Sequence, residues 1–337
     1  MKRILTIVVL VAICVTAALG MSACGDPVQG DYKVGIVQSL EHGALDSARK
    51  GFEAELTRLM GEVGKTVGFD YKNAQNDQSI ATNIVDSFVA KRRDMIFAIG
   101  TQAAQVAATK TAERNIPTLF TAVTAPVESN LVESMEKPGK NVTGTTDLVD
   151  LDRQLDLLIA VMREVKPTGL KIGFLYTSSE TNSQYQVDQM TTLIKNRRES
   201  NPELDLQEPV AKAINDMSEV AANLSALKNA GVDIVFIPTD NTIAKAVEKV
   251  RTDNEASAKL PIVCGDIDMT EGCGVATIGI NFEELGKQTA QMAFDVLYNG
   301  KNPAEMPVQQ LIKYELHRYD ENAAKIGFTV PDLSEFE

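Results

Sequence analysis

The sequence predicts a doubly wound α/β protein built from two similar lobes, because three apolar stretches occur twice in the same order. Residues 33–37 resemble residues 171–175, residues 94–99 resemble residues 233–238, and residues 116–120 resemble residues 260–264. The second copies follow the first after 138, 139 and 144 residues, so both halves share one plan. We expect the two halves to face each other across a cleft that binds a ligand.

The six repeated stretches have the pattern of strands that are buried on both faces. Each is a short run of apolar residues without alternation, as strands of a parallel sheet require. Parallel strands need long crossovers, and residues 44–59, 80–91 and 285–297 have helical spacing and sufficient length. Each half is therefore expected to run strand, helix, strand, helix, strand, in a parallel sheet.

The start of the chain predicts export. Lys2 and Arg3 precede an apolar stretch at residues 4–19, which is too short for a comfortable membrane span. The residues before Cys24 resemble a lipobox, the bacterial lipoprotein signal whose cysteine is acylated, with Met21 where leucine is usual. We therefore expect a signal peptide at residues 1–23, a lipid anchor on Cys24 at the cell membrane, and a polar tether at residues 24–31. The alternative is a plain secretory signal cleaved near Ala23.

Charge and length limit the partners of the exported chain. The whole sequence has a formal net charge of −13, and removal of residues 1–23 takes away two basic residues and no acidic ones, which leaves −15. Such an acidic chain is a poor partner for nucleic acid. Its remaining 314 residues exceed what one core usually supports, which agrees with two lobes.

The sequence offers little for metal binding or catalysis. Outside the signal and Cys24, the only cysteines are Cys264 and Cys273, which in an exported chain either form a disulfide or remain free thiols. No histidine accompanies them, so a zinc site lacks ligands, and we expect neither a metal nor a cofactor. With two histidines and no Gly-x-Ser-x-Gly motif in the chain, we expect no enzyme. An exported hydrolase that uses an aspartate from the loops is the enzymatic alternative.

The ligand should lie where the parallel strands end, because loops and helix N-termini converge there. In the first half these loops contain the candidate pairs Ser39 and Leu45, Thr101 and Gln102, and Val123 and Thr124. Thr101 opens a helix whose first backbone N–H groups have no partner within the helix, which favours a carboxylate. The alternative for Thr101 is an ordinary helix cap.

The corresponding loops of the second half are polar and acidic. They contribute Asn182, Ser183, Asp240, Asn241 and Asp266. An aspartate at a strand end can pair with a ligand ammonium group, whereas Asp240 or Asn241 can equally cap a helix at residues 243–250. Asp266 precedes no obvious helix. A carboxylate site opposite an acidic wall suits a zwitterion, and an amino acid is the simplest one.

Several of these loop residues also carry a family resemblance. The matching stretches are residues 34–38, 44–46, 51–52, 98–101, 103–105, 120–126, 141–144, 240–242, 285–286 and 300–301. In this combination, over residues 32–331, the chain resembles the ABC-transporter substrate-binding lipoproteins that include the tryptophan/tyrosine-binding proteins.

The resemblance implies a periplasmic-binding-protein type I fold and a monomer that delivers an aromatic amino acid to an ABC permease with its ATPase. It implies that Thr101 and Gln102 hold the carboxylate near Thr124, and that Asn182, Asp240 and Asp266 close over the ligand. The loop at residues 39–45 and Val123 would line the side-chain pocket. A sensor that serves a signalling partner, or an importer with another small polar ligand, are the alternatives.

The same fold implies three crossings between the lobes. We expect the first at residues 141–147, the second at residues 276–282 and the third near Lys301. The first lobe would then comprise residues 32–145 and 276–300, and the second residues 146–275 and 301–337.

Overall fold

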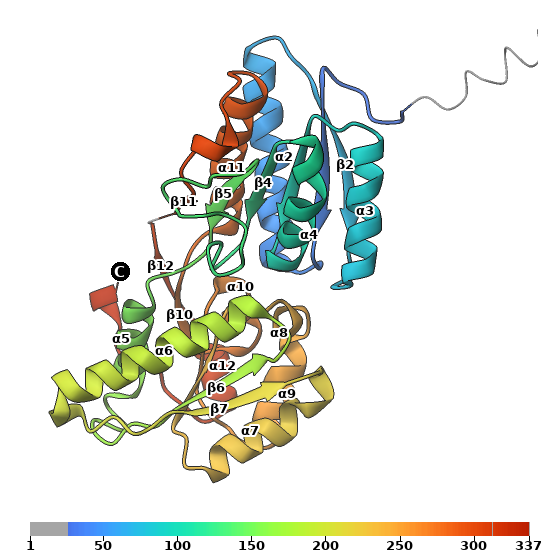
Figure 1. Cartoon of the computed structure of the whole chain (residues 1–337). Coiled ribbons are helices and arrows are strands. Elements are labelled where there is room, and N and C mark those ends of the chain that lie inside the picture. The colour runs from blue at the N-terminus through green and yellow to red at the C-terminus, as the bar shows by residue number, and fades with distance from the viewer. Residues whose placement is uncertain (1–25, 312, 337) are drawn as a thin grey trace, which may run out of the picture.

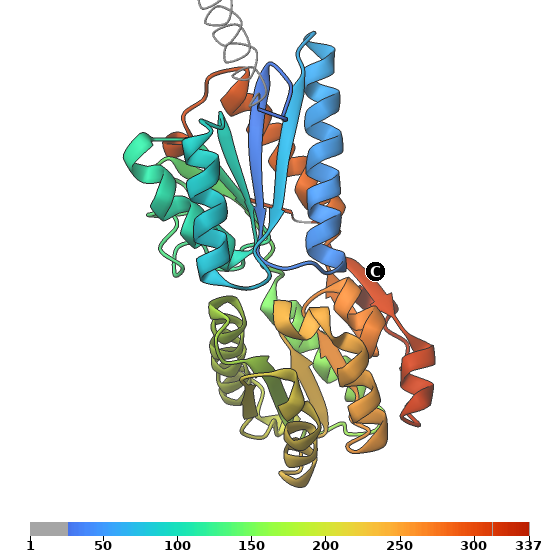
Figure 2. The same ribbon diagram turned by 90° about the vertical axis from the view of Figure 1, so that its right-hand side faces the viewer.

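Two α/β lobes lie end to end in the computed structural model, which describes residues 26–311 and 313–336 (Figures 1 and 2). The predicted signal peptide at residues 1–23 and the predicted lipid anchor at Cys24 lie outside the described residues. None of the described helices combines the length and the apolar character that crossing a membrane requires.

The first lobe contains a six-stranded parallel sheet in the order β11-β5-β4-β3-β1-β2. Its strands are β1 (Tyr32–Gln38), β2 (Val67–Asn73), β3 (Met95–Ile99), β4 (Thr118–Thr121), β5 (Val142–Thr146) and β11 (Gln309–Gln310). Its helices are α2 (Gly43–Glu62), α3 (Gln78–Ala90), α4 (Thr101–Thr111) and α11 (Phe282–Leu297). Ile36 packs in the core with α2 and α11, whereas the next residue, Val37, packs with α3 and α4. The sheet is therefore covered on both faces, as its unbroken apolar strands predicted.

The second lobe repeats this arrangement, with the strand order β12-β10-β9-β8-β6-β7. Its strands are β6 (Ile172–Thr177), β7 (Val210–Ile214), β8 (Ile234–Ile237), β9 (Ile262–Cys264), β10 (Ala276–Gly279) and β12 (Glu315–Arg318). Its helices are α5 (Leu151–Met162), α6 (Thr181–Ser200), α7 (Val220–Asn229), α8 (Asn241–Lys245), α9 (Val247–Ala256), α10 (Ile267–Cys273) and α12 (Asp320–Lys325). Short 3-10 turns occur in both lobes, at Ala112–Arg114 and Pro303–Glu305 in the first and at Pro202–Leu204, Met217–Glu219 and Ser334–Phe336 in the second. The edge strand β12 is antiparallel to β10, so this sheet is not wholly parallel as expected.

The predicted fold class is confirmed, and each of the six repeated stretches contains a strand: β1, β3 and β4 in the first lobe, and β6, β8 and β9 in the second. The sequence pattern missed β2 and β7, which lie at sheet edges and are only partly buried. A half-exposed edge strand needs no continuous apolar run, so this signal is weak. The helix expected at residues 243–250 is divided at Ala246 into α8 and α9.

The crossings between the lobes differ from the expected boundaries. Residues 276–279 form β10 in the second sheet, so the second crossing follows Gly279. Residues 301–310 stay with the first lobe, because β11 pairs with β5 and the amide of Val308 donates to the Met135 carbonyl at 2.7 Å. The chain therefore crosses between β5 and α5, between β10 and α11, and between β11 and β12. A short apolar run does not reveal which sheet it joins, because pairing depends on residues far away in the sequence.

The two separate parts of the first lobe are joined by close packing of α11 on α2. Gly51 and Gly286 permit this approach: a Cβ atom on Gly51 would lie 2.2 Å from the Glu283 carbonyl oxygen, and one on Gly286 would lie 2.0 Å from the Ala48 carbonyl oxygen. Both contacts are with backbone, which cannot rotate away. The joint therefore requires glycine at both positions.

Two alanine substitutions in the same helix should have opposite effects on the free energy of unfolding. Gly51→Ala should destabilise the protein by about 1–3 kcal/mol, because the added methyl group separates α2 from α11. Gly61→Ala, at a position where a Cβ atom meets nothing within 4 Å, should stabilise it by about 0.4–1 kcal/mol. Urea unfolding of both variants measures the difference. Equal effects would show that the helix contact does not depend on Gly51.

Candidate functional site

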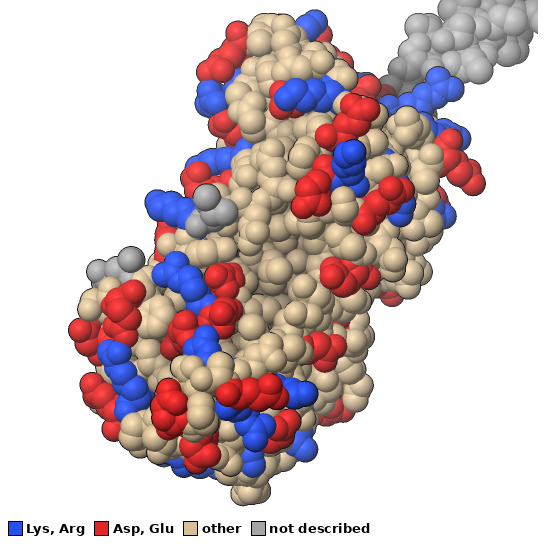
Figure 3. All heavy atoms as spheres, turned by 60° about the vertical axis from the view of Figure 1, so that its left-hand side comes forward, with Lys and Arg blue, Asp and Glu red and all other residues tan. Residues whose placement is uncertain are grey.

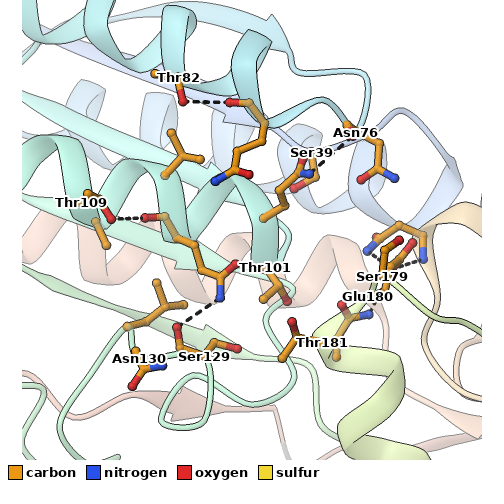
Figure 4. A pocket seen from close by; sticks show the side chains of 18 of the residues that line it. Ser39, Asn76, Thr82, Thr101, Thr109, Ser129, Asn130, Ser179, Glu180 and Thr181 are labelled. Carbon is orange, nitrogen blue, oxygen red and sulfur yellow. Dashed lines mark hydrogen bonds between the residues drawn. The ribbon is translucent and has the colours of Figure 1, made fainter.

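A cavity of about 770 Å³ lies between the two lobes at the carboxyl ends of their strands. Figure 3 shows the hollowed surface between the lobes, where few charged side chains are visible. The first lobe lines the cavity with Ser39, Asn76, Gln78, Thr82, Thr101, Gln102, Gln105, Val106, Ala108, Thr109, Lys110, Ser129, Asn130 and Leu131, and the second with Ser179, Glu180, Thr181, Asn182 and Asn241 (Figure 4). The walls are mainly hydroxyl and amide groups, so they suit a polar ligand.

The N-terminus of α4 lies in the wall from the first lobe. Its cap residue is Gly100, whose φ of 89° belongs to the left-handed region and which has no side chain to cap the helix. The Ser39 hydroxyl accepts a hydrogen bond from the Ala103 amide at 3.0 Å. The amides of Thr101 and Gln102 make no hydrogen bond to another described residue. Thr101 is thus the first helical residue rather than the cap, and the free amides can bind an anion.

The wall from the second lobe is held together by Glu180. This buried carboxylate accepts hydrogen bonds from the backbone amides of Asn241 and Thr242 at 2.9 and 2.7 Å, and from both side chains. It therefore binds the N-terminus of α8. The side-chain oxygen of Asn241 lies 3.1 Å from Nε2 of His42, which belongs to the first lobe. This contact joins the two lobes beside the cavity.

Beside this cavity lies a much smaller inner pocket of about 10 Å³, roughly the space of one water molecule. It is lined by His42, Ala44, Leu45, Ala122, Asp147, Asn182, Thr239, Asp240, Asn241, Ala244, Asp266 and Phe282. Three of these are buried aspartates, and no Lys or Arg is among the described residues that line it. The inner pocket therefore holds buried acidic groups with no basic side chain of the described residues to offset their charge.

Asp240 is both a pocket residue and a structural one. Its carboxylate accepts hydrogen bonds from the amide and hydroxyl of Thr177, from the Ser183 hydroxyl and from the Ile243 amide, at 2.6–2.9 Å. Burial, together with the charge of Glu180, raises the pKa of Asp240 to about 7. Because it caps α8 and holds the loop after β6, its removal would cost stability as well as any binding contact.

Asp266 lies opposite, at the end of β9, and the helix that follows it was not evident in the sequence. Its carboxylate accepts a hydrogen bond from the Met269 amide at 2.7 Å and caps α10. Burial, together with the charges of Asp268, Asp147 and Asp240, raises the pKa of Asp266 to about 7. Asp266 therefore caps a helix and also lines the inner pocket.

Asp147 completes the inner pocket from the first crossing between the lobes. The residue is 5% exposed, and its Oδ1 atom has no hydrogen-bond partner among the described residues. Burial raises its pKa to about 6. A buried carboxylate oxygen without a partner is costly, so a donor or a cation that reached Oδ1 of Asp147 would be stabilised there.

The structure distributes the predicted site residues over three environments. Ser39, Thr101, Gln102, Asn182 and Asn241 line the large cavity; Leu45, Asn182, Asp240, Asn241 and Asp266 line the inner pocket; Val123, Thr124 and Ser183 line neither. Val123 is fully buried in the core of the first lobe, and the Ser183 hydroxyl is occupied by Asp240 and the Thr239 carbonyl.

Several cavity residues escaped sequence reasoning. Asn76 follows β2, which was not predicted, and Asp147 follows β5, which was taken for a crossing. Ser129 and Asn130 lie in an irregular segment well beyond the end of β4. The rule that sites follow strand ends would have found Asn76 and Asp147 if their strands had been recognised.

The two cysteines are close but not bonded. Cys264 and Cys273 are buried free thiols whose Sγ atoms lie 3.7 Å apart, at the ends of β9 and α10. Burial raises the pKa of the Cys264 thiol. Within residues 26–311 and 313–336, no three His, Cys, Asp or Glu side chains are grouped in a way that could hold a metal ion.

Comparison with known proteins identifies the family of this chain. The family model described as ABC transporter substrate binding protein matches residues 33–333. A curated tyrosine-binding protein from Clostridioides difficile (strain R20291) is 35% identical over 328 residues, which is 94% of this chain and 89% of that protein.

Solved structures agree in fold. The crystal structure of an ABC domain in complex with L-Trp from Streptococcus pneumonia has a TM-score of 0.76 and 31% identity, and the match covers 88% of this chain and 96% of that one. A ligand-free, open substrate-binding protein with adhesive properties from Clostridium difficile has a TM-score of 0.65 and 33% identity, and the match covers 90% and 97%.

These similarities confirm the predicted periplasmic-binding-protein type I fold, which is the fold of extracytoplasmic substrate-binding proteins. Proteins of this kind bind substrates and are not enzymes, as the sequence predicted. Because the family model covers nearly all of the described residues, the chain belongs to the ABC transporter substrate-binding proteins.

Proposed function

We propose that this protein binds an aromatic amino acid in the interlobe cleft and, as a lipid-anchored receptor outside the cytoplasm, delivers it to an ABC permease. The observation that carries the proposal is a pair of opposite sites: a helix N-terminus with free amides in one wall, and buried carboxyl groups in the inner pocket. An amino acid has the complementary pair of charged groups on one carbon atom.

The carboxylate of the ligand would bind at Thr101 and Gln102. The free amides there point out of the N-terminal end of α4, where the helix dipole favours a negative charge by about 0.3–1 kcal/mol in exposed settings. The hydroxyl of Thr101, which is 5% exposed, adds a donor at the cavity wall. No positively charged side chain is needed at this end of the ligand.

The ammonium group would bind between Asp147 and Asp266. Burial raises the pKa of both carboxyl groups, and the charges of neighbouring aspartates add to the effect at Asp266, so an incoming cation relieves an unfavourable arrangement. A ligand that supplies the opposite charge offsets the desolvation that each carboxylate suffers. The Oδ1 atom of Asp147 thereby gains the hydrogen-bond partner that it lacks among the described residues.

The side chain of the ligand would occupy the large cavity. Its volume of about 770 Å³ falls in the usual range for small-molecule sites, and Val106 and Leu131 give it apolar wall. An aromatic cargo is favoured by the relatives, one described as tyrosine-binding and one solved with L-Trp. At similar identity the structure is also more like the L-Trp complex than the open form, which supports a closed arrangement of the lobes here.

A ligand screen tests the cargo directly. The protein from Gly25 onward should melt at higher temperature with tryptophan, tyrosine or phenylalanine, since a ligand at about 100 times its Kd stabilises the folded state by about 2.7 kcal/mol. N-acetylated and amidated forms of the same amino acids, which lack one charge, should give no shift. If only sugars or nucleosides raised the melting temperature, the protein would still be a binding protein, but its proposed ligand would not be an amino acid.

Asp147→Asn should weaken amino-acid binding by at least about tenfold, or about 1.4 kcal/mol, because it removes a buried partner of the ammonium group. Asp152→Asn replaces an exposed carboxylate five residues away and should leave affinity unchanged. Isothermal titration calorimetry measures both. Unchanged affinity in Asp147→Asn would remove this residue from the ammonium site.

Affinity should also depend on pH through the inner pocket. The pKa values of Asp147 and Asp266 are about 6 and about 7 in the ligand-free protein, so protons compete with the ammonium group below that range. Affinity should be highest near pH 8 and fall as the pH drops through 7 and 6, with proton release on binding. The raised pKa values have the opposite effect on the ligand-free fold, whose stability should fall as the pH rises from about 4, the ordinary pKa of an aspartate, to about 7. A flat affinity profile would contradict the pairing.

Cys24→Ser should release the protein from the membrane fraction, because the lipid anchor requires the thiol. Cys14→Ser, within the apolar part of the predicted signal, should leave the protein bound. Cell fractionation with immunoblotting distinguishes the two. Retention of Cys24→Ser in the membrane fraction would refute the lipobox and leave the binding function intact.

A further inference from the structure

The described chain begins with a segment that is bound tightly to the first lobe, although the sequence predicted a polar tether there. The Asp26 carboxylate accepts hydrogen bonds from both terminal nitrogens of Arg93 and lies 3.2 Å from Lys33 Nζ. The side chain of Arg93 is fully buried and also donates to Asp70 at 2.6 Å. Asp26 is therefore held by a buried guanidinium that is itself fixed in the lobe.

The next residues continue the attachment along β2. The backbone of Gln29 passes close to Gly68. A Cβ atom on Gly68 would lie 2.1 Å from the Gln29 carbonyl oxygen. The Asp31 carboxylate accepts hydrogen bonds from the amide and hydroxyl of Thr66, at 2.8 and 2.9 Å. Residues 26–31 thus make contacts at both ends and in the middle, and they are part of the folded lobe rather than a free linker.

This attachment lies at one end of the molecule. It surrounds the amino ends of β1, β2 and β3, the end of the first lobe farthest from the second lobe (Figures 1 and 2). The cleft lies at the opposite, carboxyl ends of the same strands. We call this end, with Asp26, Asp31, Lys33, Lys65, Asp70, Lys91, Arg92, Arg93 and Asp94, the anchoring pole.

The anchoring pole differs in charge from the rest of the chain. Its five basic residues balance its four acidic ones together with Glu62 at the nearby end of α2, whereas the chain after residue 23 carries 46 acidic and 31 basic residues. Asp26, Asp31 and Asp70 are each paired with at least one of these basic residues. An anionic lipid surface therefore meets no excess of negative charge here, in contrast to the acidic remainder of the molecule.

We infer that the anchoring pole faces the membrane surface, with the first lobe nearer the bilayer than the second, and that the Asp26–Arg93 contact fixes this orientation while the receptor is not engaged with the permease. This inference depends on the proposed lipid anchor at Cys24. Cys24 precedes Asp26 by two residues, and two peptide links reach no farther than roughly 8 Å. With so short a connection, the acyl chains cannot enter the bilayer unless this end of the first lobe approaches the headgroups.

Single tryptophans can test the orientation, because the chain contains none. We would place one at Glu62, the exposed last residue of α2 near the anchoring pole, or at Asn229, the exposed last residue of α7 in the second lobe. The full lipoprotein would be reconstituted into vesicles whose lipid headgroups carry a nitroxide quencher. Fluorescence of Glu62→Trp should be quenched several-fold more than that of Asn229→Trp.

Two further variants test the role of the attachment. Asp26→Asn removes the charge that binds Arg93 and should reduce the difference between the two tryptophans. Asp86→Asn removes the carboxylate of an exposed ion pair with Lys110 elsewhere in the same lobe and should leave the difference unchanged. A flexible insertion between Gly25 and Asp26, which preserves every contact of the folded body, should abolish the difference even if Asp26→Asn folds poorly.

The outcomes separate the orientation from the anchor. A protein that floats with the vesicles but shows equal quenching at both positions overturns the inference and leaves the lipid anchor intact. A protein that does not float overturns the anchor, and the orientation falls with it. Equal behaviour of Asp26→Asn and Asp86→Asn, with strong quenching at Glu62→Trp retained in both, would show that another contact holds the pole.

Discussion

The structure depends on three carboxyl groups that the fold buries at the meeting point of its two lobes. Asp147, Asp240 and Asp266 line one inner pocket, and no Lys or Arg of the described chain lines it with them. Burying these groups is unfavourable while they are charged, and the raised pKa values of all three express that cost, to which acidic neighbours add at Asp240 and Asp266. A cation that enters from the cleft removes the cost. In the proposed complex, the ammonium group of the ligand would be that cation.

This pocket is placed where binding can be linked to movement of the lobes. Asp147 lies in the first crossing, Asp240 and Asp266 belong to the second lobe, and the free amides at Thr101 belong to the first. A ligand that touches all of them makes its full set of contacts only when the lobes are together. Since only contacts that are better in the closed form can drive closure, this distribution over the hinge and both lobes is what a closing receptor requires.

Rocking of whole lobes requires that each lobe remain a single body although the chain leaves and re-enters it. In the first lobe, α11 follows most of the second lobe in the sequence and packs on α2 through Gly51 and Gly286. Beneath this joint, the rings of Phe52 and Phe97 stack with centroids 3.7 Å apart, which connects α2 to the centre of the sheet. Arg93 also joins separate parts of this lobe, because it donates hydrogen bonds both to Asp26 in the segment 26–31 and to Asp70 in β2. Rigid packing at both ends leaves the crossings as the places where the structure can bend.

The sequence by itself determined the fold class, the six central strands, the main helices and most of the loops that face the cleft. These features are local: a continuous apolar run or a helical spacing is visible within a few residues, and the rule for strand ends then locates the site. It did not reveal the edge strands β2 and β7, whose half-exposed residues carry no such run, nor the sheet that β10 and β11 join. It also gave no sign that Asp147 lies beside Asp266, or that Asp240 is bound by Thr177 and Ser183. Those facts were decided by the tertiary structure alone, because burial and charge at the pocket arise from residues that are far apart in the chain and meet only when the lobes have formed.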